Sequence, residues 1–425
     1  MLKLKEVKIG IIGLGYVGLP LALAFSKHFI VNAFDINSKR ILELKNNYDN
    51  TGEINNSNLK KSSNVIYTNY INDLSKCNFY IITVPTPIKK NKNPDLKYLI
   101  KATKDVSTLI KKDDYIIYES TVYPGVTEEV CVPIIEKISQ LTLNLDFYVG
   151  YSPERINPGD KKHRIKDIKK ITSGSSKKAS IFIDKMYKKI ITAGTHRTSC
   201  IMEAEAAKII ENTQRDLNIA LINEFAIILN KLNIDTKATI SAASTKWNFM
   251  PYMPGLVGGH CIGVDPYYLT YKSKQLGYNP KVILAGRNIN QSMPSYVAKK
   301  MYNELKHIKN DNKISKILIM GITFKENCSD IRNSKVVDLI NNLKSKKMKV
   351  DVYDPYANEK LVKNEYNLVL KTKLNKKFYD GVIIAVSHDK FLKMGTENIK
   401  RLVKKNSIIY DLKSIFKKEE TDLRL

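Results

Sequence analysis

A strand, a glycine-rich turn, a helix, a second strand and an aspartate follow one another within the first 35 residues. The β-branched run Val7–Ile12 leads into the turn 13–18, which reads GLGYVG, and after an amphipathic helix the apolar segment Ile30–Phe34 ends at Asp35. Such glycines allow a tight turn and let a pyrophosphate approach the helix N-terminus, where N–H groups and the helix dipole favour anions. The order predicts a doubly wound, parallel α/β domain that binds a dinucleotide; a glycine turn without a ligand is the alternative.

Asp35 is the residue that indicates which dinucleotide. A carboxylate at the end of the second strand accepts hydrogen bonds from the adenosine ribose and repels a 2′-phosphate, so it favours NAD over NADP. Lys39 and Arg40 are close in sequence and keep NADP open as an alternative. The residues expected to contact NAD in this region are Gly13, Gly15, Tyr16, Val17, Gly18, Asp35 and Arg40.

Polar residues end or follow three further predicted strands, Phe79–Val84, Tyr115–Glu119 and Phe147–Tyr151. In a doubly wound sheet, ligands bind at the carboxyl ends of the strands. We therefore expect ligand contacts at these ends, although each residue could instead be a turn or cap residue. The polar residues and the proline at these ends are Thr83, Pro85, Ser120, Thr121, Glu154 and Arg155.

One long helix is predicted between two α/β regions. The segment Ile201–Asp235 lacks Gly and Pro, and Lys208 and Asn212 lie four residues apart on one face of it. A lysine reaching from that face into solvent is the alternative. Strand and helix patterns resume at Lys316 without a second GxGxxG motif. The sequence thus predicts a Rossmann domain (1–199), a central helical domain (200–308) and a smaller Rossmann-like domain (309–425).

The stretch Gly258–Pro266 reads GGHCIGVDP and holds Cys261 between glycines, with His260 beside it and Asp265 four residues later. Glycines let the backbone approach a ligand closely. A cysteine in accessible, polar surroundings is suited to act as a nucleophile. A tight turn with a core cysteine is the other interpretation.

Composition limits the remaining classes of function. The net charge of +28 suggests either an anionic partner or a solvated, lysine-rich surface. The lysines are spread evenly, in segments such as KKHRIKDIKK, and no nucleic-acid motif accompanies them. We therefore favour a lysine-rich surface as the origin of the charge. The five cysteines are dispersed and odd in number, which favours a reducing cytoplasm over disulfides or zinc. No apolar run is long enough to span a membrane, and the first residues lack a signal-peptide pattern.

Five motifs occurring in order resemble the UDP-glucose/GDP-mannose dehydrogenase family over essentially the whole chain. They are Gly13–Gly18, Ser120-Thr121-Val122, Lys208 with Asn212, Gly258–Cys261, and Phe324-Lys325 through Asp330-x-Arg332. The resemblance implies two Rossmann-like domains joined by a central helical domain that forms a homodimer, the last domain binding the UDP-sugar. It also implies oxidation of the sugar C6 hydroxymethyl to a carboxylate with two NAD⁺.

The resemblance assigns roles by position. Cys261 would be the catalytic thiol: its thiolate adds to the aldehyde formed first, and the thiohemiacetal can then release a second hydride and leave a thioester for water. Lys208 and Asn212 would stabilise and position the reacting oxygen, and Thr121, Glu154 and Asp265 would hold water and assist proton transfer. Thr83, Pro85, Ser120, Thr121 and Arg332 join the cofactor site; the substrate site comprises Glu154, Arg155, Lys208, Asn212, Gly258, Gly259, His260, Lys325 and Arg287. No metal is expected.

The cysteine loop also indicates a branch of the family. Val264 stands where the UDP-glucose branch has a lysine, while Lys246–Pro251 and Gly286–Asn290 look like the branch acting on UDP-N-acetylamino sugars. Arg287 could instead be a surface arginine of a helix. We therefore expect oxidation of UDP-GlcNAc or UDP-GalNAc for a surface polysaccharide (capsule or O-antigen), with UDP-glucose or UDP-ManNAc as alternative substrates.

An NAD-binding nucleotide-sugar epimerase or dehydratase is the alternative from another class. Such enzymes need a Tyr-x-x-x-Lys pair, and this spacing occurs at Tyr268/Lys272, Tyr296/Lys300 and Tyr302/Lys306. All three pairs lie beyond the first predicted domain, so the abundance of lysine explains them better.

Overall fold

The computed structural model describes residues 2–62, 64–155, 164–259, 262–309 and 314–425. The chain divides into two compact units. The first unit comprises residues up to Glu211 together with Tyr267–Tyr278, and the second comprises Asn212–Pro266 and Asn279–Leu425.

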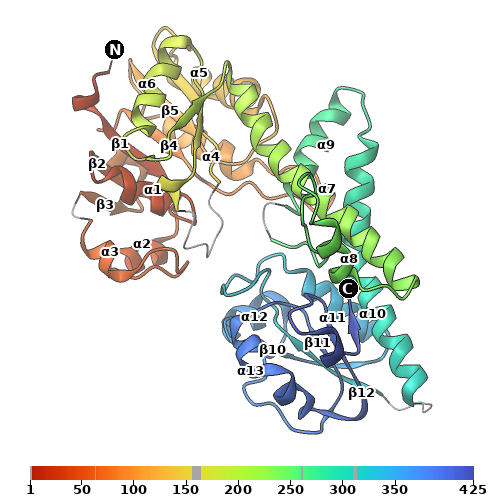
Figure 1. Ribbon diagram of the computed structural model, residues 1–425. Helices are drawn as coiled ribbons and strands as arrows, with labels where there is room; N and C mark the ends of the chain where they lie inside the picture. The colour runs from red at the N-terminus through yellow and green to blue at the C-terminus, as the bar shows by residue number, and fades with distance from the viewer. Residues whose placement is uncertain (1, 63, 156–163, 260–261, 310–313) are drawn as a thin grey trace. The chain divides into compact units, whose positions relative to one another are not determined.

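A six-stranded parallel sheet forms the centre of the first unit, in the order β3-β2-β1-β4-β5-β6. Strands β1, β4, β5 and β6 are almost entirely buried, as expected when helices cover both sides of a parallel sheet (Figure 1), while the edge strand β3 is largely half-buried or exposed. The strands are β1 (Lys8–Ile12), β2 (Ile30–Phe34), β3 (Val65–Thr68), β4 (Phe79–Ile82), β5 (Asp114–Tyr118) and β6 (Phe147–Tyr151). The helices are α1 (Gly18–Phe25), α2 (Ser38–Lys45), α3 (Asn56–Lys60), α4 (Lys97–Ser107), α5 (Val132–Ser139) and α6 (Lys177–Tyr187). A separate parallel pair, β7 (Lys170–Thr172) and β8 (Thr195–Arg197), follows β6 in the chain.

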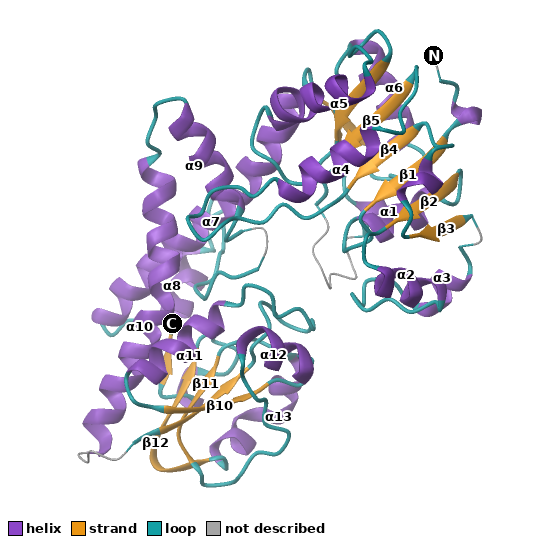
Figure 2. Ribbon diagram, turned by 180° about the vertical axis from the view of Figure 1, so that it is seen from behind, coloured by secondary structure: helices purple, strands orange, loops and turns teal. Residues whose placement is uncertain are grey.

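The second unit contains a five-stranded parallel sheet in the order β10-β9-β11-β12-β13 (Figure 2). Its strands are β9 (Lys316–Met320), β10 (Lys349–Tyr353), β11 (Tyr379–Ile384), β12 (Val403–Asp411) and β13 (Leu423–Arg424). Its helices are α8 (Thr236–Ala243), α10 (Lys281–Lys309), α11 (Lys335–Ser345), α12 (Glu359–Tyr366) and α13 (Asp389–Lys400). Apolar side chains of α10 and α11 pack on one face of this sheet. Both Rossmann-like regions expected from the sequence are therefore present.

Helices α7 (Ile201–Lys231) and α9 (Asp265–Gln275) each begin in one unit and end in the other. The long predicted helix is confirmed as α7, which ends four residues earlier than expected, before Asn233 adopts φ +57°. Within the described residues, no helix is both long and apolar enough to cross a membrane.

Helix α10 is long and contains a proline in its interior. Helix α10 begins at Lys281 and continues through Pro294. A proline inside a helix removes one hydrogen bond and usually bends or ends the helix. Here the buried contacts of Met293, Val297 and Met301 with the second sheet maintain the helix across it.

Candidate functional site

The first glycine turn leaves its backbone open to a ligand. Gly13 has φ +96°, and a Cβ on Gly18 would lie 1.8 Å from the Gly13 carbonyl oxygen, so both positions require glycine. A Cβ on Gly15 would meet no atom within 4 Å. The open space beside Gly15, at the N-terminus of α1, fits a dinucleotide pyrophosphate. Tyr16 and Val17 are half-buried in the same turn.

Asp35 connects this turn to the end of β2. Its Oδ2 accepts the Leu14 N–H at 2.8 Å and its Oδ1 accepts the Asn37 N–H at 2.9 Å. Arg40 is buried, donates to the Leu14 carbonyl oxygen at 2.9 Å and pairs with Asp49 at 2.8 Å. Arg40 thus supports the turn, and a direct contact of Arg40 with NAD stays a prediction.

The ends of β4 and β5 contribute hydroxyl groups close to the same turn. The Thr83 hydroxyl donates to the Gly13 carbonyl oxygen at 2.7 Å, and the Ser120 hydroxyl donates to the Val84 carbonyl oxygen at 2.6 Å. Thr83 therefore holds the glycine turn in place. Two further predicted residues follow these strands: Pro85, which is exposed, and Thr121, which is half-buried.

Glu154 and Lys208, which the sequence placed in one site, are in contact. Glu154 is buried after β6, and its main-chain oxygen accepts the Lys208 Nζ at 2.8 Å. Lys208 is buried on α7, and the structure gives its ammonium no other acceptor among the described residues. The remaining N–H groups are suited to a substrate oxygen. Arg155, the next residue, forms an ion pair with Glu211. Its predicted contact with the substrate stays a prediction.

Two buried residues beside Glu154 were missed by the sequence analysis. Lys170 Nζ lies 2.7 Å from an oxygen of Glu154 and 2.7 Å from an oxygen of Glu119. Lys170 belongs to the segment predicted as solvated surface, and for this residue the prediction is wrong, because its side chain is only 3% exposed. Burial, partly offset by the Lys170 charge, raises the pKa of Glu119 to about 7.

Asn212 and Asp265 are brought together in the second unit. The Asn212 Nδ2 donates to the Asp265 Oδ2 at 2.5 Å, and both residues are buried. The Asn212 Oδ1 is also buried and has no hydrogen-bond partner among the described residues. A buried acceptor without a donor is costly, so this oxygen is suited to bind a ligand hydroxyl.

The glycines before the predicted nucleophile pack against the loop after β9. Gly259 has φ +86°, and a Cβ there would lie 2.9 Å from Phe324 Cδ2. A Cβ on Gly258 would lie 2.7 Å from the Asn333 carbonyl oxygen, so this position also requires glycine. His260 and Cys261 lie outside the described residues, and their roles stay predictions.

Arg287 is buried on α10, so the alternative of a surface arginine is wrong. Its Nη1 lies 2.6 Å from the Asp216 Oδ1, and a Cβ on Gly263 would lie 3.9 Å from its Nη2. Burial raises the pKa of Asp216, and the Arg287 charge opposes that shift. Arg287 is therefore held by Asp216 near Gly263; its contact with substrate stays a prediction.

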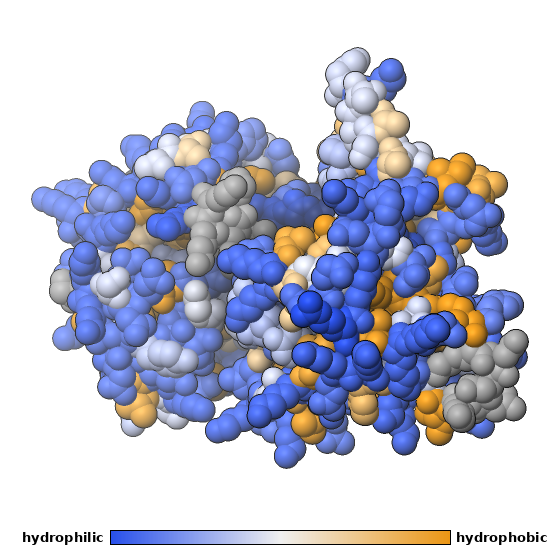
Figure 3. All heavy atoms as spheres, turned by 60° about the horizontal axis from the view of Figure 1, so that its bottom comes forward, coloured by the Kyte–Doolittle hydropathy of each residue, from blue (hydrophilic) through white to orange (hydrophobic). Residues whose placement is uncertain are grey.

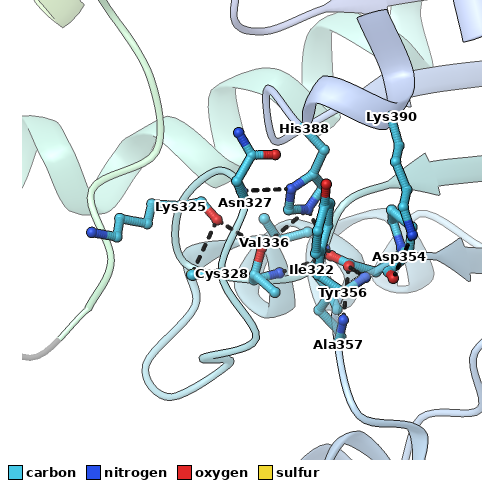
Figure 4. Close-up of polar contacts among 12 residues, drawn as sticks. Ile322, Lys325, Asn327, Cys328, Val336, Asp354, Tyr356, Ala357, His388 and Lys390 are labelled. Carbon is cyan, nitrogen blue, oxygen red and sulfur yellow. Dashed lines mark hydrogen bonds and ion pairs between the residues drawn. The ribbon is translucent and has the colours of Figure 1, made fainter. Parts of the chain in front are cut away.

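Lys325, predicted for the substrate site, and Arg332, predicted for the cofactor site, lie on the loop after β9. Lys325 is half-buried, with its Nζ 5.5 Å from the centre of the Phe324 ring. Arg332 is exposed and forms a bidentate pair with Asp330 at 2.9 and 2.7 Å. Figure 4 shows that the Lys325 side chain points away from a buried polar cluster around Asp354.

That cluster repeats the aspartate arrangement of the first sheet. Asp354 follows β10 as Asp35 follows β2, and its carboxylate accepts the N–H groups of Ile322 (2.7 Å) and Tyr356 (2.8 Å). Gly321 has φ +95°, close to that of Gly13. In the second unit His388 Nε2 also lies 3.1 Å from the Asp354 Oδ2 (Figure 4). The second sheet thus has a related turn. Its carboxylate, Asp354, differs from Asp35 in also contacting a histidine side chain. Among the described residues, no group of three or more His, Cys, Asp or Glu could hold a metal ion.

Comparisons with known proteins agree with this geometry. Residues 7–191, 202–292 and 318–418 match the NAD-binding, central and UDP-binding domains of the UDP-glucose/GDP-mannose dehydrogenase family. The chain is 52% identical to a UDP-N-acetyl-D-glucosamine 6-dehydrogenase of Pseudomonas aeruginosa (99% of this chain, 100% of the relative) and 53% identical to one of Salmonella typhi (100% of both). A solved UDP-D-ManNAc dehydrogenase of Pyrococcus horikoshii superposes with a TM-score of 0.88 at 30% identity, covering 97% of this chain and 96% of that one. The chain belongs to the UDP-glucose/GDP-mannose dehydrogenase family.

Proposed function

We propose that this protein is a UDP-N-acetyl-D-glucosamine 6-dehydrogenase that supplies a uronic acid for a surface polysaccharide. The observation that carries the substrate is the identity of 52% and 53%, over full length, to two enzymes of that name. The open backbone at Gly15 and the carboxylate of Asp35 support NAD as the cofactor.

The proposed reaction removes four electrons from C6. Bound NAD⁺ accepts one hydride in each of two oxidations. The first oxidation also releases the hydroxyl proton and leaves an aldehyde, to which the Cys261 thiolate adds. Loss of the second hydride gives a thioester, and water releases the carboxylate and restores the thiol. Each sugar thus yields two NADH.

The described residues support these steps. The buried Lys208 ammonium can stabilise the negative oxygen of the thiohemiacetal, and Asn212 Oδ1 can accept a hydrogen bond from the substrate hydroxyl. Glu154, with Thr121 and Asp265 as further candidates, is proposed to hold the attacking water and accept its proton.

A parallel assay tests the substrate. NADH formation should be measured with UDP-GlcNAc, UDP-GalNAc, UDP-ManNAc and UDP-glucose under identical conditions. We expect the highest kcat/KM with UDP-GlcNAc. If another UDP-sugar gave a higher kcat/KM, that sugar would be the substrate instead of UDP-GlcNAc. An epimerase would release no stoichiometric NADH, because it returns its hydride.

We propose that two copies associate through α7. Four large apolar side chains, three or four residues apart, are exposed: Leu221, Phe225 and Ile228 near the end of α7, and Leu232 directly after its last residue. Such a stripe is typical of a face that another helix covers. The proposal predicts a dimer in sedimentation equilibrium for the wild type and a monomer for Phe225→Glu. A wild-type monomer would contradict it.

The division into domains 1–199, 200–308 and 309–425 is proposed as the functional one, supported by the three family matches that fall within it. A cytoplasmic location is proposed from the dispersed cysteines. The face in Figure 3 is mostly hydrophilic, which supports a solvated lysine-rich surface as the origin of the +28 charge.

A further inference from the structure

Of the lysines that the structure describes, only Lys170 and Lys208 are buried. Both donate to Glu154: Lys208 to its main-chain oxygen at 2.8 Å, and Lys170 to its carboxylate Oε2 at 2.7 Å. In a chain whose other described lysines are half-buried or exposed, burying two ammonium groups at one glutamate is costly and calls for a specific use.

The cluster around Lys170 is assembled from four segments of the first unit. Glu119 follows β5, Glu154 follows β6, Lys170 begins β7 and Tyr187 ends α6. Lys170 Nζ contacts both carboxylates at 2.7 Å, and the Tyr187 hydroxyl donates to the other oxygen of Glu119. Because the Glu119 carboxylate is held on both sides, it fixes the position of the Lys170 ammonium.

The charges of the cluster keep Lys170 protonated. Burial alone would lower the pKa of Lys170, but the charges of Glu119 and Glu154 outweigh this effect and raise it. Both oxygens of the Glu154 carboxylate are held. Its Oε1 accepts the Arg155 N–H at 2.6 Å, and its Oε2 accepts a hydrogen bond from Lys170 Nζ at 2.7 Å.

We propose that Lys170 is a positioning residue that orients the Glu154 carboxylate for hydrolysis of the thioester. This inference rests on the proposed function. In that step the water oxygen bonds to the thioester carbon and one water proton passes to Glu154. The C–S bond breaks with its electron pair going to the Cys261 sulfur, and the second water proton leaves as the carboxylic acid ionises. No oxidation occurs in this step. Replacing Lys170 should therefore slow hydrolysis of the thioester, which follows the transfer of both hydrides.

The test uses a variant that removes Lys170 together with one of its two carboxylate partners. Lys170→Met alone would leave two buried carboxylates together and could fail to fold. The double variant Lys170→Met/Glu119→Gln removes the cation and the Glu119 carboxylate at once, so Glu154 is left without a second carboxylate beside it. Lys170→Arg, which keeps the cation, serves as the conservative variant, and Lys188→Met serves as a control, because Lys188 is largely exposed and pairs with Asp184.

We expect the double variant to transfer both hydrides of the first turnover at close to the wild-type rate. Its steady-state kcat should fall ~10- to 100-fold. This is the typical loss when a residue is replaced that orients a reacting group without contacting the substrate. Mass spectrometry after acid quench should then show the sugar nucleotide bound covalently to Cys261. Lys170→Arg should recover part of the rate.

The outcomes separate this inference from the proposed function. If the wild type forms no NADH with any UDP-sugar, the proposed function fails. If the wild type is active but the double variant hydrolyses its thioester at the wild-type rate, Lys170 does not position Glu154. An even loss of both hydride transfer and hydrolysis, with no sugar nucleotide bound covalently to Cys261 after acid quench, would also overturn the inference, because it indicates structural damage alone.

Discussion

Gly259 and Asn333 are joined by two hydrogen bonds. The Gly259 N–H donates to the Asn333 carbonyl oxygen at 3.1 Å, and the Asn333 Nδ2 donates to the Gly259 carbonyl oxygen at 2.7 Å. The segment that leads into the predicted nucleophile is thereby held against the loop that carries Lys325 and Arg332. The loop of the UDP-binding domain thus helps to position the backbone just before Cys261.

Replacing Gly259 by alanine should disrupt this junction. The new Cβ would clash with Phe324 in addition to the strain of φ +86°, so we expect a loss of ~2–4 kcal/mol of stability and most of the activity. Gly277→Ala is the matched control, because Gly277 has φ +81° but a Cβ there would meet no atom within 4 Å. Thermal unfolding and kcat should be compared for both variants. Equal effects of the two substitutions would show that packing against Phe324 is unimportant.

Asp35→Asn should weaken the preference for NAD. The substitution keeps an acceptor for the Leu14 N–H but removes the charge that we propose binds the ribose hydroxyls and repels a 2′-phosphate. We expect kcat/KM for NAD⁺ to fall ~10- to 100-fold, while that for NADP⁺ does not fall. Asp354→Asn is the control: Asp354 accepts corresponding main-chain bonds in the second sheet, so the ratio of the two kcat/KM values should stay unchanged. An unchanged ratio in Asp35→Asn would remove Asp35 from cofactor selection.

Glu205 should make the stability of the first unit depend on pH. It is buried on α7 and accepts the N–H groups of Gly125 at 2.6 Å and Thr127 at 3.0 Å. Burial raises the pKa of Glu205 to about 7. Between about pH 4.5 and 7 the folded state therefore binds more protons than the unfolded state, so stability falls as pH rises through this range, by at most ~1.4 kcal/mol per pH unit.

The thermal midpoint at pH 5, 6, 7 and 8 measures this effect. Glu205→Gln should show a smaller decrease with pH than the wild type, with the remainder due to Glu119 and Asp114, whose pKa values burial also raises to about 7. Glu203→Gln, two residues earlier and exposed, is the control and should keep the wild-type slope. The assignment would be wrong if Glu205→Gln and the wild type had the same slope.

The sequence predicted those features that depend on local patterns. The strands Ile30–Phe34 and Phe147–Tyr151 were predicted with their observed bounds, because each is an apolar run ended by turn residues. The assignment of Lys208 and Glu154 to one site followed only from the resemblance to the family, and their hydrogen bond was not predicted. Lys170 could not be found in this way: within a lysine-rich segment, one buried lysine looks like its solvated neighbours. Its burial depends on Glu119, 51 residues away in the chain.

Tertiary packing also explains the remaining differences. Pro294 suggests a helix end when read locally, yet α10 continues through it because its apolar side chains pack on the second sheet. The helical pattern around Arg287 is equally compatible with a surface arginine. Its burial depends on the ion pair with Asp216, which lies 71 residues earlier in the chain. The pairing of Asn333 with Gly259 was not predicted, because the two residues are 74 positions apart in the chain.

The number of NADH molecules formed per UDP-GlcNAc tests the central claim most directly. With limiting UDP-GlcNAc and excess NAD⁺, the absorbance at completion should correspond to two NADH for each sugar, with a C6 carboxylate as the product. Cys261→Ser should nearly stop this reaction, because no thiohemiacetal can form to release the second hydride. A yield of one NADH or none from the wild type, or undiminished uronate formation by Cys261→Ser, would contradict the account.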